Sequence, residues 1–360
     1  MRFDQVVVTA APGDATTGSA FEIRSLLRRL GPSEIFAQNI HPDLHEEVFP
    51  LHDFRRTSRG SRRPADDIII FHGSIGAPEV FSFILGRPER IVLVYHNISP
   101  ADAFLPYDPA FAGLLESGRR DVARLARRAE IALTPSHFNA RELMAMGYRD
   151  VRVWPLIVDL DRMRSVVPDP QTVVDLDSLD GPMLLFVGQM LPHKRPDYLV
   201  QAFHILSTYL VPEAHLALVG APRLESYRRR LFTYIDELNL FRLHRVGFID
   251  DAILAAYWRR ANAWVTASEH EGFLQPVLEA MGFDLPIVAR SYGAVPETVG
   301  GAGIVIPAGD GPEVFAEAMA EVLTNERLRE RLVALGRNRR ASFSADASRA
   351  AFLQHLVDVA

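Results

Sequence analysis

The sequence contains no cysteine and only one lysine, Lys194, among its 360 residues. The absence of cysteine excludes disulfides, thiolate metal sites and cysteine nucleophiles, so the fold depends on packing alone. Arginine supplies almost all of the positive charge. The single lysine is either a chance survivor or a sign that position 194 needs a compact ammonium group, which a planar guanidinium does not replace.

The chain also lacks a positive excess, because its formal net charge is −6. This balance carries no nucleic-acid-binding signature, and we expect no nucleic-acid partner. The first residues lead directly into a short apolar run, 6–8, which is too brief for a signal peptide or a membrane span. We therefore expect a cytoplasmic protein. Hydrophobic residues make up 48% of the chain, which is typical of a globular protein.

Short apolar runs bounded by turn residues alternate with helical periodicity along the whole chain, a pattern typical of parallel sheets built from βαβ units. The length exceeds what one core usually organises. We predict an α/β protein of two doubly wound Rossmann-like domains, over 1–165 and 182–340, with a linker at 166–181. The stretch 155–182 is rich in Pro and Asp and holds one short helical piece. A ligand site is expected in the interdomain cleft, at the carboxyl ends of the strands.

The predicted strands are 5–10, 34–37, 67–71, 90–95, 131–134 and 151–154 in the first half, and 183–187, 215–219, 243–246, 263–266, 286–289 and 304–306 in the second. The predicted helices include 19–30, 108–128, 136–146, 196–210, 224–238, 251–260, 276–281 and 312–323.

Several common motifs are missing. The loop from Gly13 to Ser19 has the glycine spacing of a P-loop without its lysine, and it is no dinucleotide-binding G-x-G-x-x-G either. Kinase and nicotinamide-dehydrogenase functions are therefore weakly supported. The loop can be a plain helix entry or can contact a substrate. No spacing of histidines or carboxylates indicates a metal site, so we expect no metal.

The most informative segment is Ser268–Met281. A predicted strand ends there, a glycine turn follows, and Pro276 stands where the first turn of a helix tolerates a missing N–H. Such a helix start attracts a phosphate or a sugar through its unpaired amides and its dipole. Glu271 lies before the helix and Glu279 inside it. Eight residues of helix separate carboxyl groups by about 12 Å, beyond the roughly 5 to 9.5 Å of a hydrolytic pair, so the spacing disfavours a glycosidase.

A second segment, Leu184–Pro196, is a buried strand that opens into a cationic loop before the next helix. Lys194 and Arg195 beside a helix N-terminus are unfavourable unless an anion lies among them, and a diphosphate would supply it. The alternative is an ordinary solvated basic loop, which is the better explanation for Arg195 alone.

These two segments resemble the donor-site motifs of family-4 retaining glycosyltransferases, which have the GT-B fold. The likeness lies in the glycine-basic stretch ending in Lys194 and in Glu271 and Glu279 with seven residues between them. It extends to Ala294–Glu297 and Gly300–Gly303. The first domain is similar to a subset of bacterial members through 13–15, 71–76 and 95–100. In this fold the last helix, 341–360, usually returns to the first domain.

The resemblance implies a transferase, a hexosyltransferase by expectation, that uses a UDP- or GDP-linked sugar as co-substrate and no cofactor or metal. Lys194 would neutralise the donor diphosphate, Glu279 would hold the ribose hydroxyls and Glu271 the transferred sugar. His96 would face the reacting centre; otherwise it is a packing or turn residue. The implied catalytic residues are Lys194, Glu271 and His96. Donor-binding residues are Gly188, Gln189, Lys194, Arg195, Glu271, Gly272, Phe273, Leu274 and Glu279, and acceptor-binding residues are Gly13, Asp14, His72, His96 and Asn97.

Two positions depart from the family pattern. Gln189 stands where the family usually has an arginine, which leaves one charge fewer for the diphosphate unless Arg195 compensates. Leu274-Gln275 replaces the usual Gly-Leu after Phe273 and predicts a bulkier wall beside the sugar.

Other functions remain open at this stage. An epimerase or a glycoside phosphorylase would share the fold, and a sugar-nucleotide-binding protein without turnover would explain Gln189. Members of the family with lipid-linked acceptors often contact membranes through basic surfaces, and peripheral binding at the inner face is a minority hypothesis here against a solvated face. The arginines concerned are Arg55, Arg56, Arg59, Arg62, Arg63, Arg119, Arg120, Arg124, Arg127 and Arg128.

Overall fold

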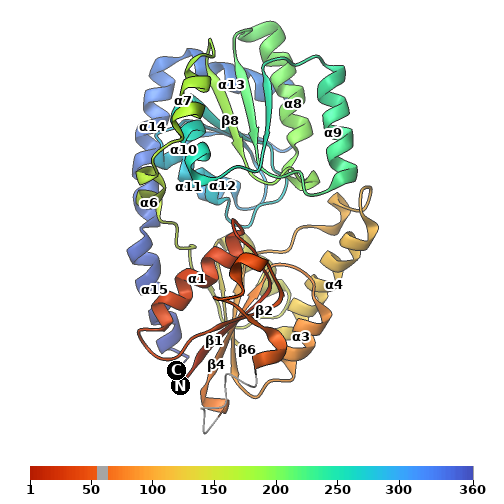
Figure 1. The fold of residues 1–360 in the computed structure, drawn as a ribbon, viewed down its shortest axis with the longest axis vertical. Coiled ribbons are helices and arrows are strands. Elements are labelled where there is room, and N and C mark those ends of the chain that lie inside the picture. Colours follow the sequence, from red (N-terminus) through yellow and green to blue (C-terminus); the bar gives the residue numbers. More distant parts are fainter. Residues whose placement is uncertain (55–63, 360) are drawn as a thin grey trace. The chain divides into compact units, whose positions relative to one another are not determined.

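The computed structural model describes residues 1–54 and 64–359, which form two compact units (Figure 1). The first unit comprises Met1–Asp102, Ala110–Ile157 and Ala345–Ala360. The second comprises Ala103–Pro109 and Val158–Ser344. Each unit is built on its own parallel sheet, so the predicted fold class of two Rossmann-like α/β domains is confirmed.

The first sheet has seven strands in the order β3-β2-β1-β4-β5-β6-β7, all paired in parallel. Its strands are mostly continuous apolar runs because a parallel sheet covered by helices is buried on both faces. Their bounds are β1 Phe3–Ala10, β2 Ile35–Ile40, β3 Phe49–Pro50, β4 Ile68–Gly73, β5 Arg90–Tyr95, β6 Ala129–Thr134 and β7 Val151–Val153.

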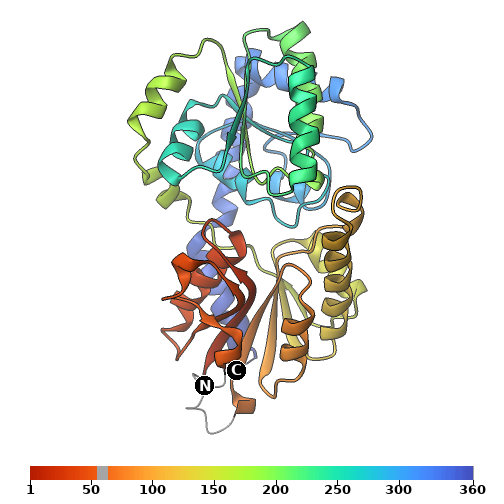
Figure 2. The same ribbon diagram turned by 45° about the vertical axis from the view of Figure 1, so that its right-hand side comes forward.

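Helices cover both faces of this sheet. On one face lie α1 (Ala15–Leu27) and α15 (Ala345–Val357), which comes from the far end of the chain (Figure 1, Figure 2). The indole of Trp154 packs against Phe352 of α15 and donates a hydrogen bond to the Ser348 carbonyl at 2.8 Å. The remaining helices of this unit are α3 Pro78–Leu85, α4 Pro109–Leu125 and α5 His137–Ala145.

The second sheet has six strands in the order β10-β9-β8-β11-β12-β13, again all parallel. An apolar cluster joins this sheet to α8, α9 and α13. The strand bounds are β8 Met183–Val187, β9 His215–Val219, β10 Leu243–Gly247, β11 Ala263–Thr266, β12 Ile287–Arg290 and β13 Ile304–Ile306. The helices are α6 Leu160–Ser165, α7 Pro170–Asp177, α8 Pro196–Ile205, α9 Glu225–Glu237, α10 Asp251–Arg260, α11 Gln275–Gly282, α12 Val295–Val299, α13 Pro312–Thr324 and α14 Glu326–Arg340.

The Pro- and Asp-rich stretch 155–182 lies mostly in the second unit and carries two helices instead of one: α7 lies within the predicted linker 166–181, and α6 precedes it. Arginines of α10 hold this stretch in place. Arg260 donates hydrogen bonds to the carbonyls of Leu176, Leu179 and Gly181 at 2.9 to 3.1 Å. The aspartates of this stretch are explained in part by helix capping, because Asp159 and Asp169 are the N-caps of α6 and α7.

A short segment from the first half of the chain, Ala103–Pro109, also belongs to the second unit. The Phe104 ring lies 5.4 Å from that of His193, and the Tyr107 ring lies edge-on to that of Tyr227 at 5.0 Å. Ser226 donates its hydroxyl hydrogen to the Tyr107 carbonyl at 2.9 Å.

Two loops at the carboxyl ends of β8 and β9 pack backbone against backbone. A Cβ added to Gly220, whose φ is +143°, would lie 1.9 Å from the carbonyl oxygen of Gly188. We expect Gly220→Ala to lower the free energy of unfolding by about 3 kcal/mol or more, because backbone on both sides would have to move. Urea unfolding measures the loss.

Gly247→Ala is the matched control. Gly247 also has a positive φ, +78°, but an added Cβ would meet no atom within 4 Å. This variant should lose only about 1 kcal/mol from backbone strain. Equal losses in the two variants would show that the close approach of the loops is unimportant.

Candidate functional site

The predicted site residues follow strands at the two points where strand order reverses. These points lie between β8 and β11 in the second unit and between β1 and β4 in the first. Ligands of open α/β sheets bind beyond the carboxyl ends of strands at such points. Lys194 follows β8 and Glu271 follows β11, while Gly13 follows β1 and His72 lies near the end of β4. Each unit thus has a candidate site of its own.

Lys194 and Glu271 form an ion pair across the reversal point of the second sheet. The Lys194 Nζ donates to Glu271 Oε1 at 2.6 Å, and the two side chains are 22% and 7% exposed. The backbone of Glu271 is fixed in turn, because the amide of Ala294 donates to its carbonyl at 2.9 Å. A Cβ on Gly293 would lie 2.5 Å from the same oxygen. Two residues 77 positions apart, each implied as catalytic, are thereby joined.

Arg195 is balanced by carboxylates of the protein itself. It donates from Nε to both carboxylate oxygens of Asp197 at 3.1 Å and pairs with Glu269. Arg290 donates to the same Glu269 oxygen at 2.9 Å. Both cations of this loop therefore have carboxylate partners within the protein, two for Arg195 and one, Glu271, for Lys194, so neither requires a bound anion to be balanced.

The turn between Glu271 and α11 has an unusual backbone. Leu274, the N-cap of α11, has φ +65°, a left-handed conformation that costs a non-glycine residue about 1 kcal/mol. The side chains of Phe273 and Leu274 are buried, and Thr298 Oγ1 donates to the Phe273 carbonyl at 2.6 Å. No side chain caps the first turn of α11. Pro276 has no N–H and the Val277 amide donates to the Leu274 carbonyl at 3.1 Å, so the amides of Gly272, Phe273 and Leu274, just before the helix, are the local donors best suited to an anion.

Glu279 lies buried on α11, about one turn after the helix start at Gln275. Burial raises the pKa of its carboxyl to about 7, although a hydrogen bond from Gln275 opposes this shift. The Gln275 Nε2 donates to Glu279 Oε1 at 2.9 Å. From the sequence, Gln275 is expected only as part of a bulkier wall beside the sugar. Its i, i+4 spacing from Glu279 is the sequence signal that indicates this contact.

Gly188 and Gln189 extend β8 into the loop that carries Lys194. The Gly188 amide donates to the Val219 carbonyl at 2.9 Å, and the Leu191 amide donates to that of Gln189 at 2.9 Å. Both residues are partly exposed. The backbone of the loop is therefore hydrogen-bonded to the end of β9 at Gly188, six residues before Lys194.

In the first unit, Gly13 and Asp14 form the entry to α1. Gly13 has φ +70°, which favours glycine. Asp14 is the N-cap, since its Oδ2 accepts hydrogen bonds from the amide and hydroxyl of Thr17 at 2.9 and 3.0 Å. The loop is thus a helix entry, as one of the two sequence interpretations held.

The rings of His72 and His96 lie edge to edge and nearly parallel at the ends of β4 and β5, with ring centroids 5.2 Å apart and an interplanar angle of 16°. His72 is fully buried and both of its ring nitrogens have hydrogen-bond partners. The ring of His72 therefore has no unused nitrogen to offer an acceptor in this structure. His96 is partly exposed, and the next residue, Asn97, turns the chain with φ +76°. Asn97 Nδ2 donates to Asn139 Oδ1 at 2.6 Å.

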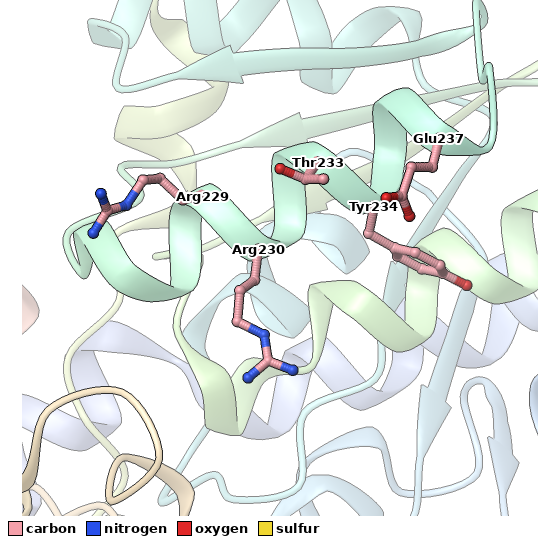
Figure 3. A pocket seen from close by; sticks show the side chains of 5 residues that line it. All are labelled: Arg229, Arg230, Thr233, Tyr234 and Glu237. Carbon is pink, nitrogen blue, oxygen red and sulfur yellow. The ribbon is translucent and has the colours of Figure 1, made fainter.

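Two surface hollows lie away from these residues. One, of about 310 Å³, lies over α9 and is lined by Arg229, Arg230, Thr233, Tyr234 and Glu237 (Figure 3). The other, of about 400 Å³, is lined by Leu85, Ala123, Arg124 and Arg127. Neither is lined by a predicted site residue.

The arginines of α4 are largely paired within the first unit. Arg119 pairs with Glu142, Arg120 with Glu116 at 2.9 Å and Arg124 with Asp121 at 3.1 Å. This arrangement favours a solvated, balanced face. The other predicted cluster, Arg55, Arg56, Arg59, Arg62 and Arg63, lies outside the described residues.

Within residues 1–54 and 64–359, no helix has the length and apolar character needed to cross a membrane. Over the same residues, no group of three or more His, Asp or Glu side chains could hold a metal ion.

Comparison with known proteins points to one family for the second unit. Residues 175–339 match the profile of the family Glycosyl transferases group 1. The match runs from the last residues of α7 into α14 and includes every predicted donor-site residue.

Named relatives agree with this match. The chain is 32% identical over 165 residues to D-inositol 3-phosphate glycosyltransferase of Thermobifida fusca, covering 44% of this chain and 38% of that protein. It is 28% identical over 162 residues to O-antigen chain mannosyltransferase B of Escherichia coli, covering 44% and 42%. The chain therefore spans less than half the length of these relatives.

Solved structures extend the similarity to both units and show the fold. Sucrose-phosphate synthase from Thermosynechococcus elongatus has a TM-score of 0.77 at 19% identity, with 99% of this chain and 98% of that chain covered. HepE of Anabaena, solved with UDP and glucose, has a TM-score of 0.75 at 17% identity, with 99% and 100% covered. The chain has the GT-B fold.

Proposed function

We propose that this protein is a retaining glycosyltransferase that moves a sugar from a UDP- or GDP-linked donor to a hydroxyl acceptor. The observation that carries the proposal is the Lys194–Glu271 ion pair at the strand-order reversal of a unit that matches Glycosyl transferases group 1. The acceptor would be a saccharide, a lipid-linked saccharide or a small molecule.

In this proposal the leaving diphosphate is stabilised by Lys194 and the start of α11. Negative charge builds on the diphosphate as the glycosidic bond breaks, and a fixed cation with oriented amides lowers the energy of that charge without reorganising. Binding the diphosphate would draw the Lys194 ammonium toward the phosphates and change its 2.6 Å contact with Glu271. The carboxylate of Glu271 would then be available to accept hydrogen bonds from sugar hydroxyls.

Glu279 would accept hydrogen bonds from the ribose hydroxyls. A carboxylate whose pKa burial raises to about 7 gains most from such donors, because they replace the water it has lost. Gln275 would donate to one carboxylate oxygen of Glu279 and leave the other oxygen to accept from the ribose hydroxyls. Retention of configuration would follow from attack of the acceptor on the same face of the sugar, with the donor phosphate helping to remove the acceptor proton.

The acceptor would be held by the first unit, through Gly13, Asp14 and Asn97, with His96 facing the reacting centre. Gly13 and Asp14 follow the carboxyl end of β1, and His96 and Asn97 follow that of β5; β4 lies between these two strands in the sheet. The fold alone does not select an acceptor.

A thermal-shift screen with UDP, GDP and ADP tests the donor site. A ligand that binds only the native state at 100 times its Kd stabilises by about 2.7 kcal/mol. We expect UDP or GDP to raise the melting temperature and ADP to have a smaller effect. A response to none of the three would contradict a UDP- or GDP-linked donor.

Product analysis separates the competing activities. With donor and an acceptor panel, a transferase forms a glycoside and free nucleoside diphosphate. An epimerase converts the donor without an acceptor, and a phosphorylase requires free phosphate. Tight nucleotide binding without any of these reactions would indicate a binding protein, the interpretation that Gln189 motivates.

The arginines of α4 and of 55–63 suggest a test for a lipid-linked acceptor. We expect little binding to vesicles of anionic phospholipid at 0.15 M salt, because the α4 arginines are already paired. Strong, salt-sensitive binding would instead support peripheral membrane contact.

A further inference from the structure

Four groups of the first unit form a continuous line of hydrogen bonds that ends at His96. Gln5 of β1 donates from Nε2 to the Ala20 carbonyl of α1 at 3.0 Å. Gln5 Oε1 lies 2.9 Å from His72 Nε2, and His72 Nδ1 lies 2.9 Å from His96 Nε2. We call this line the histidine relay. Gln5 and His72 are both fully buried, so water does not substitute for any of these partners.

The chemistry of the first partner sets the direction of every bond in the relay. A carbonyl oxygen only accepts, so the Gln5 amide must turn its NH₂ toward Ala20 and its oxygen toward His72. That oxygen also only accepts, so His72 must carry its hydrogen on Nε2. The Nδ1 of a neutral His72 is then an acceptor, and the hydrogen between the two rings must belong to His96 Nε2.

Both rings are held neutral, which the relay requires. Burial lowers the pKa of His72 well below its usual range, and the neighbouring His96 lowers it further. Burial likewise lowers the pKa of His96 to about 4. A second hydrogen on His72 would place two N–H groups face to face across 2.9 Å unless His96 changed its tautomer.

We infer that the histidine relay fixes His96 as the Nε2–H tautomer, so that its Nδ1 offers a lone pair that accepts a hydrogen bond from a substrate hydroxyl. Gln5 and His72 are then positioning residues, which act only through His96. His96 is suited to this because it lies at the carboxyl end of β5, is partly exposed and uses only Nε2 in the relay. The identity of the hydroxyl rests on the proposed function; the tautomer does not.

A second histidine pair in the other unit provides an internal reference. The rings of His215 and His244 also lie edge to edge, with ring centroids 5.2 Å apart and His215 Nδ1 2.9 Å from His244 Nε2. Here, however, His215 Nε2 has two partners, an Arg242 guanidinium nitrogen at 2.7 Å and Asp180 Oδ1 at 3.4 Å. The guanidinium only donates and the carboxylate only accepts, so the two partners favour opposite tautomers of His215, and the closer guanidinium favours Nδ1–H. Among the described residues of the first unit there is no such competing pair at His72 Nε2, where Gln5 Oε1 is the partner.

Nitrogen-15 NMR of histidine-labelled, full-length protein tests the relay without any substrate. Long-range proton–nitrogen correlations distinguish the two neutral tautomers, and His96→Gln and His244→Gln assign the rings. We expect His96 at neutral pH as the Nε2–H tautomer by at least about tenfold, because the other tautomer leaves buried partners unpaired. His96 found as the Nδ1–H tautomer, or as an even mixture, would overturn the inference.

Two variants show what maintains the tautomer. Gln5→Met keeps the side-chain length but removes the acceptor for His72, so the preference at His96 should fall below tenfold. Arg242→Met, the matched control in the other unit, should change His244 and leave His96 as it is. A folded Gln5→Met protein whose His96 keeps its full preference would remove Gln5 from the relay and contradict the proposal.

The outcomes separate the relay from the proposed function. If His96 has the expected tautomer but the protein transfers no sugar, the histidine relay is supported and the proposed transferase function is contradicted. If the protein transfers sugar with His96 in the other tautomer, the transferase function is supported and the relay is contradicted.

Discussion

Replacing Lys194 by alanine is expected to lower kcat for glycosyl transfer by about 10²- to 10³-fold, the usual effect of removing one fixed group that stabilises transition-state charge. The reason is local. Lys194 is the only lysine of the chain, and the neighbouring Arg195 is already balanced by Asp197 and Glu269. No nearby cation of this loop is left to take its place. Steady-state kinetics with the donor identified by thermal shift measure the loss.

The ion pair with Glu271 makes a simple alanine variant ambiguous, and a double variant resolves it. Lys194→Ala leaves a carboxylate that is only 7% exposed without its cation, which should cost about 1 to 3 kcal/mol of stability because the lysine itself is partly solvated. Lys194→Ala with Glu271→Gln removes the uncompensated charge and should recover most of that stability. It should not recover kcat.

Lys194→Arg completes this test. It keeps the charge but replaces a compact ammonium with a planar fork, so it should keep the ion pair with Glu271 and still lose activity. Full activity in Lys194→Ala would refute the site assignment. Full activity in Lys194→Arg alone would show that charge suffices and that the single lysine is a chance survivor.

Much of the fold could be predicted because buried parallel strands are short apolar runs bounded by turns. The bounds of β5, β8, β9, β11 and β13 agree with the sequence-based ones. The edge strand β3, Phe49–Pro50, was missed because two residues carry no periodicity. Predicted helix 196–210 ends its α-helical part at Ile205 and continues as a π-helical turn, a change of hydrogen bonding that side-chain pattern does not encode.

Gly188, Lys194 and Glu271 were singled out by the glycine-basic loop, the two spaced glutamates and the family resemblance. The structure brings Lys194 and Glu271 together because the strand ends of a parallel sheet meet at one edge, but their pairing could not be predicted. The ion pair of Lys194 with Glu271 and the engagement of Arg195 by two carboxylates depend on contacts across strands, which a sequence does not list. The same holds for His72, whose burial and relay partners come from three adjacent strands and a helix.

Replacing Glu279 by glutamine should remove a pH dependence of stability. The pKa of Glu279 is raised from 4.5 to about 7 in the folded protein. Between these values the folded state holds a proton that the unfolded state has lost, so stability falls as pH rises. The fall from pH 5 to pH 8 amounts to about 3 kcal/mol, at 1.36 kcal/mol per pKa unit. Urea unfolding of Glu279→Gln should lack this fall, while Glu330→Gln, at an exposed position of α14, should keep it.

The same titration should govern donor binding in the opposite sense. Ribose hydroxyls donate to an ionised carboxylate, so affinity for the nucleotide should be about tenfold weaker at pH 6 than well above pH 7, where Glu279 is ionised. Glu279→Gln should bind weakly at both pH values, and calorimetric titration at pH 6 and 8 measures both proteins. A nucleotide affinity of the unaltered protein that does not change with pH would mean that Glu279 does not contact the ribose. If both expectations hold, the ionised Glu279 carboxylate both destabilises the free protein at neutral pH and binds the donor. The ribose hydroxyls would then donate the hydrogen bonds that the buried carboxylate lacks in the free protein.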